Sequence, residues 1–307
     1  MIVHTFAHPR AGLIGNPSDG YFGKTISFTF SNFRAEVKLY ETPELEILSS
    51  QRDHSRFESI RHLAKDVRLH GYYGGIRLLK AAIKRFHDYC DEQGIQLDDR
   101  NFTIRYRSDI PPQVGLAGSS AIITACFRAL MAFYGVSIPK PIQANLILSV
   151  ENVELGIPAG LQDRVAQVYE GMTFMDFNRE LMERQGCGRY EPLDVGLLPE
   201  LYIAYRSELS EGTEVFHNNI RSRWERGEPE VVEAMKTWAG LAEKVRDLLK
   251  AGRKDDIGPL LDANFDLRCR IYKISRGNLR MVAAARSVGA TAKFTGSGGA
   301  IVGSYKG

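Results

Sequence analysis

Apolar and polar residues alternate in the first third of the chain, which is the pattern of half-buried β-strands. The strands predicted from this alternation cover residues 2–7, 25–30, 35–40 and 101–107, with a further short strand over 44–49. Residues 8–24 break the pattern with glycine and proline between polar side chains. We expect this segment to form either a ligand-binding loop or a pair of tight turns.

Longer segments carry apolar residues at helical spacing. The helices predicted from this spacing cover residues 76–92, 122–134, 142–155, 213–226, 229–249, 256–272 and 278–288, and a helix with loops is predicted over 51–68. Strands are predicted over 172–177, 201–205 and both sides of a glycine turn in 289–302, and residues 179–189 are predicted to be a linker or surface hairpin.

The mixture of these elements predicts an α+β protein. The pattern of the chain changes near Phe177, where a strand is followed by a polar stretch. We therefore predict two domains, covering residues 1–177 and 178–307 of the 307-residue chain.

Composition narrows the class of protein. Hydrophobic residues make up 44% of the chain and charged residues 25%, as in globular proteins, and the net charge of +3 disfavours a nucleic-acid binder. No apolar run is long enough for a bilayer, and the N-terminus does not read as a secretory signal. The cysteines are scattered without metal-site spacing and are expected to be reduced thiols of a cytoplasmic protein, at Cys90, Cys126, Cys187 and Cys269.

The segment Pro111–Ala121 has the composition of a phosphate-binding loop. Two prolines end the preceding strand, two glycines allow a tight turn, and two serines precede a long apolar helix. The start of a helix has unpaired N–H groups and a partial positive charge, both of which suit a phosphate group. A serine-capped helix after an ordinary turn is the alternative interpretation.

Two common nucleotide-binding motifs are absent. Ser18 occupies the position of the first glycine of a P-loop that would end at Gly23-Lys24-Thr25. Ile301 stands where a dinucleotide-binding motif starting at Gly296 needs its third glycine. Neither a P-loop nucleotidase nor a Rossmann dehydrogenase is therefore indicated.

Three glycine-rich segments, Arg10–Asp19, Pro111–Ala121 and Lys293–Gly299, occur in an order and separation that resemble the three motifs of the GHMP kinases, with Glu151 and Asp163 between the second and third. The resemblance extends over nearly the whole chain. It implies a two-domain α+β fold, with an N-terminal domain like domain 2 of ribosomal protein S5 and a ferredoxin-like C-terminal domain. The chain ends soon after the third motif, so the C-terminal domain is expected to be a shortened one.

Two departures from the usual motif pattern of the family resemble one branch of it. Ala117 lies between Leu116 and Gly118, where the family usually reads Gly-Leu-Gly-Ser-Ser-Ala, and Leu161 or Gln162 adds a residue before Asp163. These features resemble the branch that phosphorylates glucuronic acid on its anomeric hydroxyl. The resemblance implies an ATP-dependent sugar-1-kinase in the cytoplasm. Another sugar or sugar-phosphate kinase of the family is the alternative, and a non-catalytic sugar sensor is a third reading.

The resemblance also implies roles for individual residues. Asp163 is expected to face the sugar hydroxyl as a base or an orienting group, Arg10 to stabilise the transferred charge, and Ser120 and Glu151 to hold Mg²⁺. Taken singly, Glu151 reads as a solvated carboxylate and Asp163 as a helix cap. The residues expected to bind the phosphates of ATP are Pro112, Gly115, Leu116, Ala117, Gly118, Ser119, Ser120 and Ala121.

A further set is expected to contact the sugar: Asn16, Ser18, Asp19, Lys24, Arg164, Gly296, Ser297 and Gly298. A bound sugar carboxylate needs a basic partner, because an unpaired buried charge is costly. Arg10, Lys24 and Arg164 are the candidates for this partner.

Overall fold

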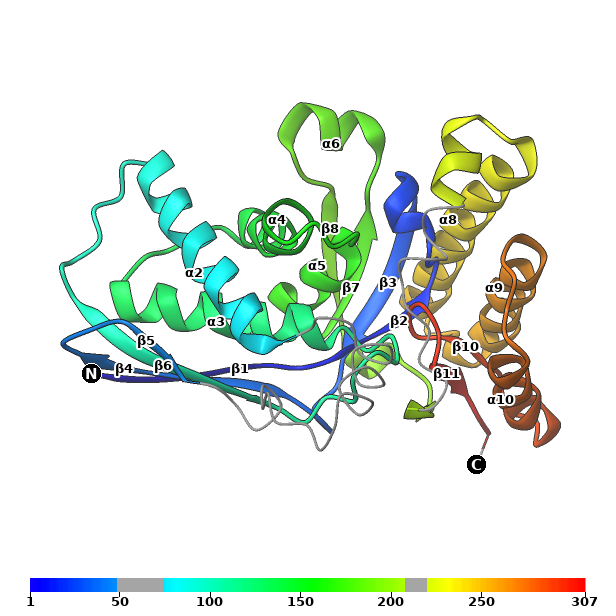
Figure 1. Ribbon diagram of the computed structural model, residues 1–307. Helices are drawn as coiled ribbons and strands as arrows, with labels where there is room; N and C mark the ends of the chain where they lie inside the picture. The colour runs from blue at the N-terminus through cyan, green and yellow to red at the C-terminus, as the bar shows by residue number, and fades with distance from the viewer. Residues whose placement is uncertain (49–73, 208–219, 307) are drawn as a thin grey trace, which may run out of the picture.

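The computed structural model describes residues 1–48, 74–207 and 220–306. The helix predicted over 51–68 lies outside the described residues, and the one predicted over 213–226 is described only from residue 220, where the chain is helical to residue 225. Three β-sheets and their covering helices form an elongated α+β molecule (Figure 1).

The first sheet lies under two helices. Its strands, in spatial order, are β1 (Ile2–Ala7), β4 (Ala35–Thr42), β6 (Asn101–Ser108) and β5 (Glu46–Leu48). Helices α2 (Gly75–Glu92) and α3 (Gly118–Tyr134) lie on one side of it (Figure 1). The rings of Phe86 and Phe127 meet edge to face at 6.1 Å between the two helices. Burial of such aromatic rings holds this half of the molecule together.

The second sheet places the first glycine-rich segment. Its strands, in spatial order, are β2 (Arg10–Ile14), β3 (Lys24–Thr29), β7 (Met172–Asp176) and β8 (Arg189–Leu193), all antiparallel. The interpretation of residues 8–24 as a loop is therefore wrong for residues 10–14. Both faces of β2 are buried, so its sequence lacks the alternation that marks a half-exposed strand. Only the 3₁₀ helix η1 (Ser18–Tyr21) and its flanks form a turn.

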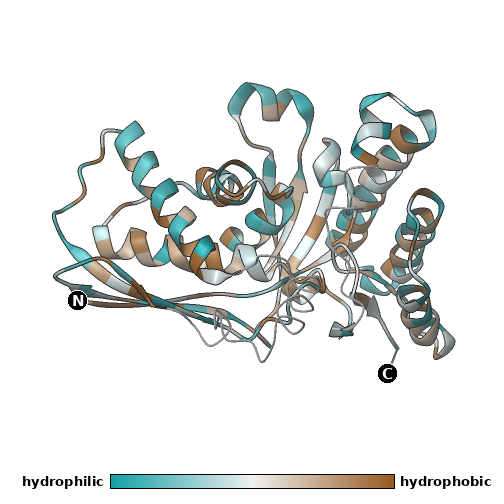
Figure 2. Ribbon diagram, in the orientation of Figure 1, coloured by the Kyte–Doolittle hydropathy of each residue, from teal (hydrophilic) through white to brown (hydrophobic). Residues whose placement is uncertain are grey.

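Helices and a π-helical turn connect the first sheet to the second. These are α4 (Lys140–Ser149), the turn η3 (Val150–Glu154) and α5 (Leu161–Tyr169). The prediction of a linker or hairpin over 179–189 is also wrong. Helix α6 (Arg179–Gln185) forms there, because the side chain of Asn178 caps its first turn. No residue of α6 is buried, and Figure 2 shows it as largely hydrophilic.

The third sheet and three long helices form the C-terminal part. The sheet has the order β10 (Lys293–Phe294), β11 (Ala300–Ser304) and β9 (Leu201–Tyr205). The short helix η4 (Val195–Leu197) precedes β9 in the chain, and η6 (Lys254–Ile257) precedes α9. The helices are α8 (Pro229–Lys250), α9 (Gly258–Ile271) and α10 (Arg276–Ser287). The buried Trp238 of α8 donates its ring N–H to the carbonyl of Asn264 on α9, at 3.0 Å.

The sequence also led to expectations about the domain boundary, the cysteines and membrane-spanning segments. Strand β8 follows residue 177 yet pairs with β7, so hydrogen bonds cross the predicted boundary, which stays a prediction. All four cysteines are free thiols. Within the described residues, no helix combines the length and apolar character needed to cross a membrane.

Candidate active site

The three glycine-rich segments are in direct backbone contact. The N–H of Arg10 donates to the carbonyl of Leu116 at 3.2 Å, and the N–H of Gly12 donates to that of Thr295 at 2.8 Å. A Cβ atom added to Gly296 would lie 2.5 Å from the carbonyl oxygen of Gly115, so a larger residue would separate the second and third segments. The fold thus joins at one point the segments that the sequence analysis grouped as motifs.

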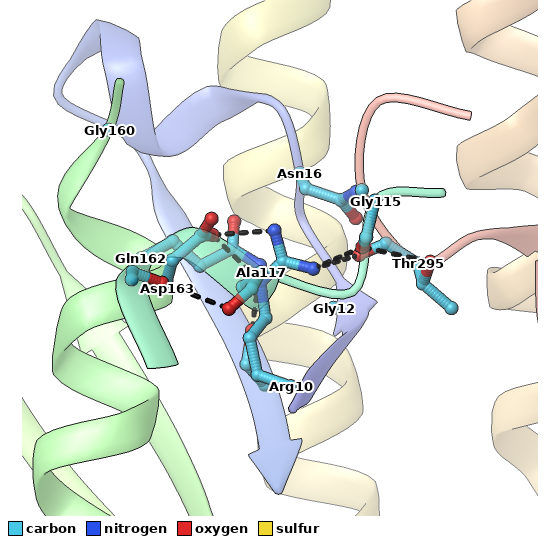
Figure 3. Close-up of polar contacts among 12 residues, drawn as sticks. Arg10, Gly12, Asn16, Gly115, Ala117, Gly160, Gln162, Asp163 and Thr295 are labelled. Carbon is cyan, nitrogen blue, oxygen red and sulfur yellow. Dashed lines mark hydrogen bonds and ion pairs between the residues drawn. The ribbon is translucent and has the colours of Figure 1, made fainter. Parts of the chain in front are cut away.

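The side chain of Arg10 is at the centre of this junction (Figure 3). Its Nε donates to Oδ1 of Asp163 at 2.7 Å, and one terminal nitrogen lies 2.5 Å from the same oxygen. The other terminal nitrogen donates to the carbonyl oxygens of Gly115 at 2.7 Å and Thr295 at 3.1 Å. The two residues predicted to be catalytic are therefore brought together as a charged pair.

Asp163 lies in the first turn of α5, which begins after Gly160. A carboxylate is favourable there, because the N-terminus of a helix carries partial positive charge. The second oxygen of Asp163 is 3.4 Å from a guanidinium nitrogen of Arg164. The Asp163 side chain is 23% exposed, against 7% for Arg10, so the carboxylate is the member of the pair that a ligand can reach.

Glu151 forms a second charged pair beside the first. Its side chain is buried in η3 and makes an ion pair with Arg164. Its other oxygen accepts a hydrogen bond from the hydroxyl of Ser119 at 2.8 Å. The hydroxyl of Ser120 instead contacts the side chain of Gln167 at 2.7 Å. The structure thus brings Glu151 to Ser119 rather than to Ser120.

The hydroxyl of Ser119 and the carboxylate of Glu151 are hard oxygen donors of the type that Mg²⁺ accepts. Two protein donors fit a Mg²⁺ ion that takes its remaining ligands from nucleotide phosphates and water. The described part of the chain contains no group of three or more acidic, histidine or cysteine side chains suited to a metal.

The start of α3 has an unusual backbone. Ala117 precedes the helix with φ 60° and ψ 45°, a left-handed conformation that L-residues other than glycine rarely adopt. Its carbonyl accepts a hydrogen bond from the side chain of Gln167 at 2.9 Å, which stabilises the turn. No side chain caps the first turn of α3, so its N–H groups are available to an anion.

Asp19 lies in η1, near enough to Asp163 for the two carboxyl groups to interact. Burial raises the pKa of its carboxyl to about 7, and the charge of Asp163 adds to this rise, while Arg10 opposes it. A Cβ atom on Gly160 would lie 2.6 Å from Oδ2 of Asp19, so glycine lets η1 approach the start of α5. The carboxyl groups of Asp163 and Asp19 therefore lie near each other, the first in direct contact with Arg10 and the second without such a contact among the described residues.

The remaining predicted substrate residues divide into two groups. Asn16 belongs to the junction, where its side-chain oxygen accepts a hydrogen bond from Lys293 at 2.6 Å. Ser18 closes the turn around η1 through two hydrogen bonds to the backbone of Lys24, and the ammonium of Lys24 pairs with Glu243 on α8. Among the described residues, Ser18 and Lys24 make no hydrogen bond or ion pair to Arg10 or Asp163.

The third segment is held by Arg268 of α9. Its guanidinium donates to the carbonyl oxygens of Gly296 at 3.0 Å and Ser297 at 3.4 Å. Gly298 has φ 146°, within the range that favours glycine. The predicted residues of this segment thus use their backbone for contacts with α9.

Several residues of the junction were not singled out from the sequence. Lys293 is fully buried and donates to the carbonyl oxygens of Gly12 at 2.5 Å and Phe294 at 2.7 Å, as well as to Asn16. Burial holds its pKa well below the usual range, and the nearby arginines act in the same direction. Gln167 lies one helical turn after Asp163 on α5, a spacing that could have indicated its position beside the serines.

Comparison with known proteins agrees with this geometry. Residues 77–171 match the family model described as the GHMP kinases N terminal domain. Glucuronokinase 1 of Arabidopsis thaliana is 45% identical over 95% of this chain and 82% of that protein. Probable glucuronokinase 2 of the same plant is 46% identical over 95% of this chain and 81% of its own length.

A solved mevalonate kinase from Methanococcus jannaschii superposes with a TM-score of 0.71 at 21% identity, covering 99% of this chain and 90% of that one. This similarity shows the fold, and it confirms the predicted α+β fold class. The resemblance inferred from the motifs is confirmed as well, including its likeness to glucuronokinases. The chain belongs to the GHMP kinase family.

Proposed function

We propose that the protein transfers the γ-phosphoryl group of ATP to the anomeric hydroxyl of glucuronate, giving glucuronate 1-phosphate and ADP. The observation that carries the proposal is the 45–46% identity to two Arabidopsis glucuronokinases over 95% of the chain. The Arg10–Asp163 pair, at the junction of the three glycine-rich segments, supplies groups suited to phosphoryl transfer.

The uncapped first turn of α3 would hold the phosphates of ATP. Backbone N–H groups of Gly118, Ser119 and Ser120 offer fixed donors there, and the helix dipole favours negative charge. Pro112, Leu116 and Ala121 would shape the loop around them, with Leu116 and Ala121 buried against the core. Positioning of this kind accounts for much of the catalysis of phosphoryl transfer.

The reaction forms one bond and breaks one bond. The anomeric oxygen attacks the γ-phosphorus, the bond from that phosphorus to the β-γ bridging oxygen breaks, and ADP leaves with the bonding electrons. Asp163 would accept or orient the hydroxyl proton, and Arg10 would stabilise the negative charge on the transferred group. Because Asp163 already accepts charged hydrogen bonds, its role as orienting group is favoured over that of a strong base.

Mg²⁺ is proposed to bind beside Glu151 with a serine hydroxyl as the second ligand. The family resemblance implies Ser120 as this ligand, whereas the contact with Glu151 favours Ser119. When bound, the ion would neutralise charge on the phosphates of ATP. Arg164 holds the other side of the Glu151 carboxylate and so fixes its orientation towards the start of α3.

The test is an ADP-release assay with ATP and a panel of acceptors: glucuronate, galacturonate, galactose, glucose and mevalonate. We expect the highest kcat/KM with glucuronate. Turnover of another sugar, with none on uronic acids, would support a different sugar kinase of the family. Absence of turnover on every acceptor, with binding of glucuronate retained, would support the sensor. A cytoplasmic location and the division at residue 177 remain part of the proposal.

A further inference from the structure

Glucuronate differs from glucose by a carboxylate, and the inference below rests on the proposed function because it concerns recognition of that group. The three basic residues predicted as partners already have charged partners. Arg10 pairs with Asp163, and Arg164 pairs with Glu151. Lys24 pairs with Glu243 at 2.5 Å. Each would have to give up an existing ion pair to bind the sugar.

The other buried cations of the junction are also occupied. An ammonium group has three donors, and Lys293 directs them to Gly12, Asn16 and Phe294. Arg268 holds the carbonyl oxygens of the third segment and lies over the ring of Phe294, with 5.2 Å from its guanidinium carbon to the ring centroid. These two residues position the third segment.

Arg221 is a cation of a different kind. It lies in the helical stretch 220–225, is exposed, and stacks on the ring of Tyr21 at 5.1 Å from the ring centroid. One terminal nitrogen would be 3.8 Å from a Cβ atom on Gly20, so its guanidinium lies against η1 beside Asp19. Within the described ranges, Arg221 makes no hydrogen bond or ion pair, and its donors remain available to a ligand.

Two polar groups next to Arg221 provide an independent observation. The hydroxyl of Tyr272 is buried and has no hydrogen bond of good geometry among the described residues. Burial raises the pKa of both Tyr272 and Tyr21, and a weak side-chain hydrogen bond between the two rings contributes as well, so the hydroxyl of Tyr272 is only partly satisfied. The half-buried carboxyl of Asp19 is held by the backbone N–H groups of Asp19 and Gly20 and has no side-chain donor among the described residues. Groups of this kind commonly contact a ligand.

We propose that Arg221 binds the carboxylate of glucuronate, with Asp19 and the hydroxyl of Tyr272 contacting the sugar between Arg221 and Asp163. The carboxylate and the anomeric hydroxyl are attached to the two carbons that flank the ring oxygen. With the hydroxyl at Asp163, the carboxylate lies a few ångströms away, and η1 is one of the elements within that reach, because Asp19 interacts with the charge of Asp163 and approaches the start of α5. The planar guanidinium, held over the ring of Tyr21, can donate two parallel hydrogen bonds to a carboxylate.

The test compares Arg221→Met, which keeps the length of the side chain, with Arg221→Lys. We expect Met to raise KM for glucuronate about 10- to 100-fold, as for loss of a charged hydrogen bond, with kcat little changed and Lys intermediate. Affinity for glucose, measured by calorimetric titration, should not change. Glu225 lies near enough to Tyr21 to raise its pKa, so Glu225→Gln should lower KM for glucuronate, an effect that a structural role of Arg221 would not produce.

Arg179→Met is the matched control, because Arg179 also stacks on an aromatic ring beside η1, that of Phe22 at 4.5 Å from the centroid. It should leave KM unchanged. Turnover of glucuronate by the wild type with equal KM in Arg221→Met would overturn the inference and leave the proposed function standing. Equal losses of glucose and glucuronate binding would show a general structural role. A wild type inactive on glucuronate would overturn the proposed function, and this inference with it.

Discussion

The two sides of the candidate active site differ in how their charges are satisfied. On the side of α3 and α5, Arg10 pairs with Asp163, and Arg164 pairs with Glu151. On the side of η1, the carboxyl of Asp19 has no charged partner in direct contact among the described residues. Asp163 is 23% exposed and Asp19 is half-buried, so neither carboxyl is fully removed from solvent and the two differ chiefly in their charged partners.

This contrast indicates which contacts the protein makes by itself and which it leaves to a ligand. Paired charges fix the groups that must meet the phosphates at a defined position, as required for phosphoryl transfer. At η1, the carboxyl of Asp19 is held by backbone N–H groups and has no side-chain cation in direct contact among the described residues, so a sugar hydroxyl can add to its contacts. The site therefore combines a preorganised half with a half that is completed by its substrate.

The largest effect is expected from loss of the paired carboxylate in Asp163→Asn. The amide keeps the shape but removes the charge that faces Arg10, and kcat should fall about 10²- to 10⁴-fold, the range for loss of a positioned acid–base group. Steady-state assays with glucuronate and ATP measure this. Asp176→Asn is the control, because Asp176 is also a buried carboxylate, 3.6 Å from Lys24, and should keep kcat. An unchanged kcat in Asp163→Asn would refute the catalytic assignment.

The second effect concerns stability of the paired side. Arg164→Met leaves Glu151 as a buried charge without its cation, which is expected to lower the free energy of unfolding by about 3–5 kcal/mol. Urea denaturation measures the change. The double variant Arg164→Met with Glu151→Gln should regain most of the loss.

Lys84→Met gives the comparison with an exposed ion pair. Lys84 is exposed and pairs with Asp88 one turn along α2 and with Glu154, and its loss is expected to change the free energy of unfolding only slightly, because water screens exposed ion pairs. A loss in Arg164→Met no greater than that in Lys84→Met would mean that the buried pair does not hold this side together.

The unpaired carboxyl should make substrate binding depend on pH. Asp19 is neutral below its raised pKa of about 7 and ionised above it, facing Asp163, Arg10 and Tyr21. Ionisation adds a negative charge beside an anionic sugar, so KM for glucuronate should rise about fivefold between pH 6 and pH 8. The Asp19→Asn variant should show no such rise, and a rise retained in that variant would assign it to another group.

The same group predicts how stability changes with pH. The pKa of Asp19 is raised in the folded state, so between its ordinary value of 3.8 and about 7 the folded protein binds more protons than the unfolded one. The contribution of Asp19 to stability is therefore lost as the pH rises through this window. Denaturation of the wild type and Asp19→Asn at pH 5 and pH 8 measures it, and an identical pH dependence in both would exclude Asp19 as its cause.

The sequence predicted most elements of the fold because the periodicity of their apolar residues is strong. It failed for β2, whose buried faces leave no alternation, and for α6, whose seven residues are polar and start at a single asparagine cap. Strand β2 is defined by its packing in the sheet and α6 by its single capping residue, so local periodicity reveals neither element.

The candidate site was predictable where its residues stand in glycine-rich segments. Arg10 was identified in this way and Asp163 from its place between the second and third segments, and the structure places the two residues in contact. Their further partners depend on contacts across the chain, as for Arg10 and Thr295, which are separated by 285 positions. The exchange of Ser119 for Ser120 beside Glu151 is set by the direction of each side chain at the start of α3. Composition and spacing do not define that direction.

The smallest effect concerns two tyrosines, the half-buried Tyr202 and the buried Tyr272. The hydroxyl of Tyr202 donates to the carbonyl of Thr291 at 2.7 Å, whereas that of Tyr272 has no hydrogen bond of good geometry within the described residues and makes only a weak contact with Tyr21. Tyr202→Phe should therefore lower the free energy of unfolding by about 0.5–1.5 kcal/mol, and Tyr272→Phe should leave it unchanged or raise it slightly. Thermal denaturation without ligand measures both.

Saturating glucuronate should then stabilise the wild type more than Tyr272→Phe, because only the wild type offers the sugar a hydroxyl at that position. Equal ligand-induced shifts would mean that Tyr272 does not contact the sugar, and that its unpaired hydroxyl is a cost unrelated to binding.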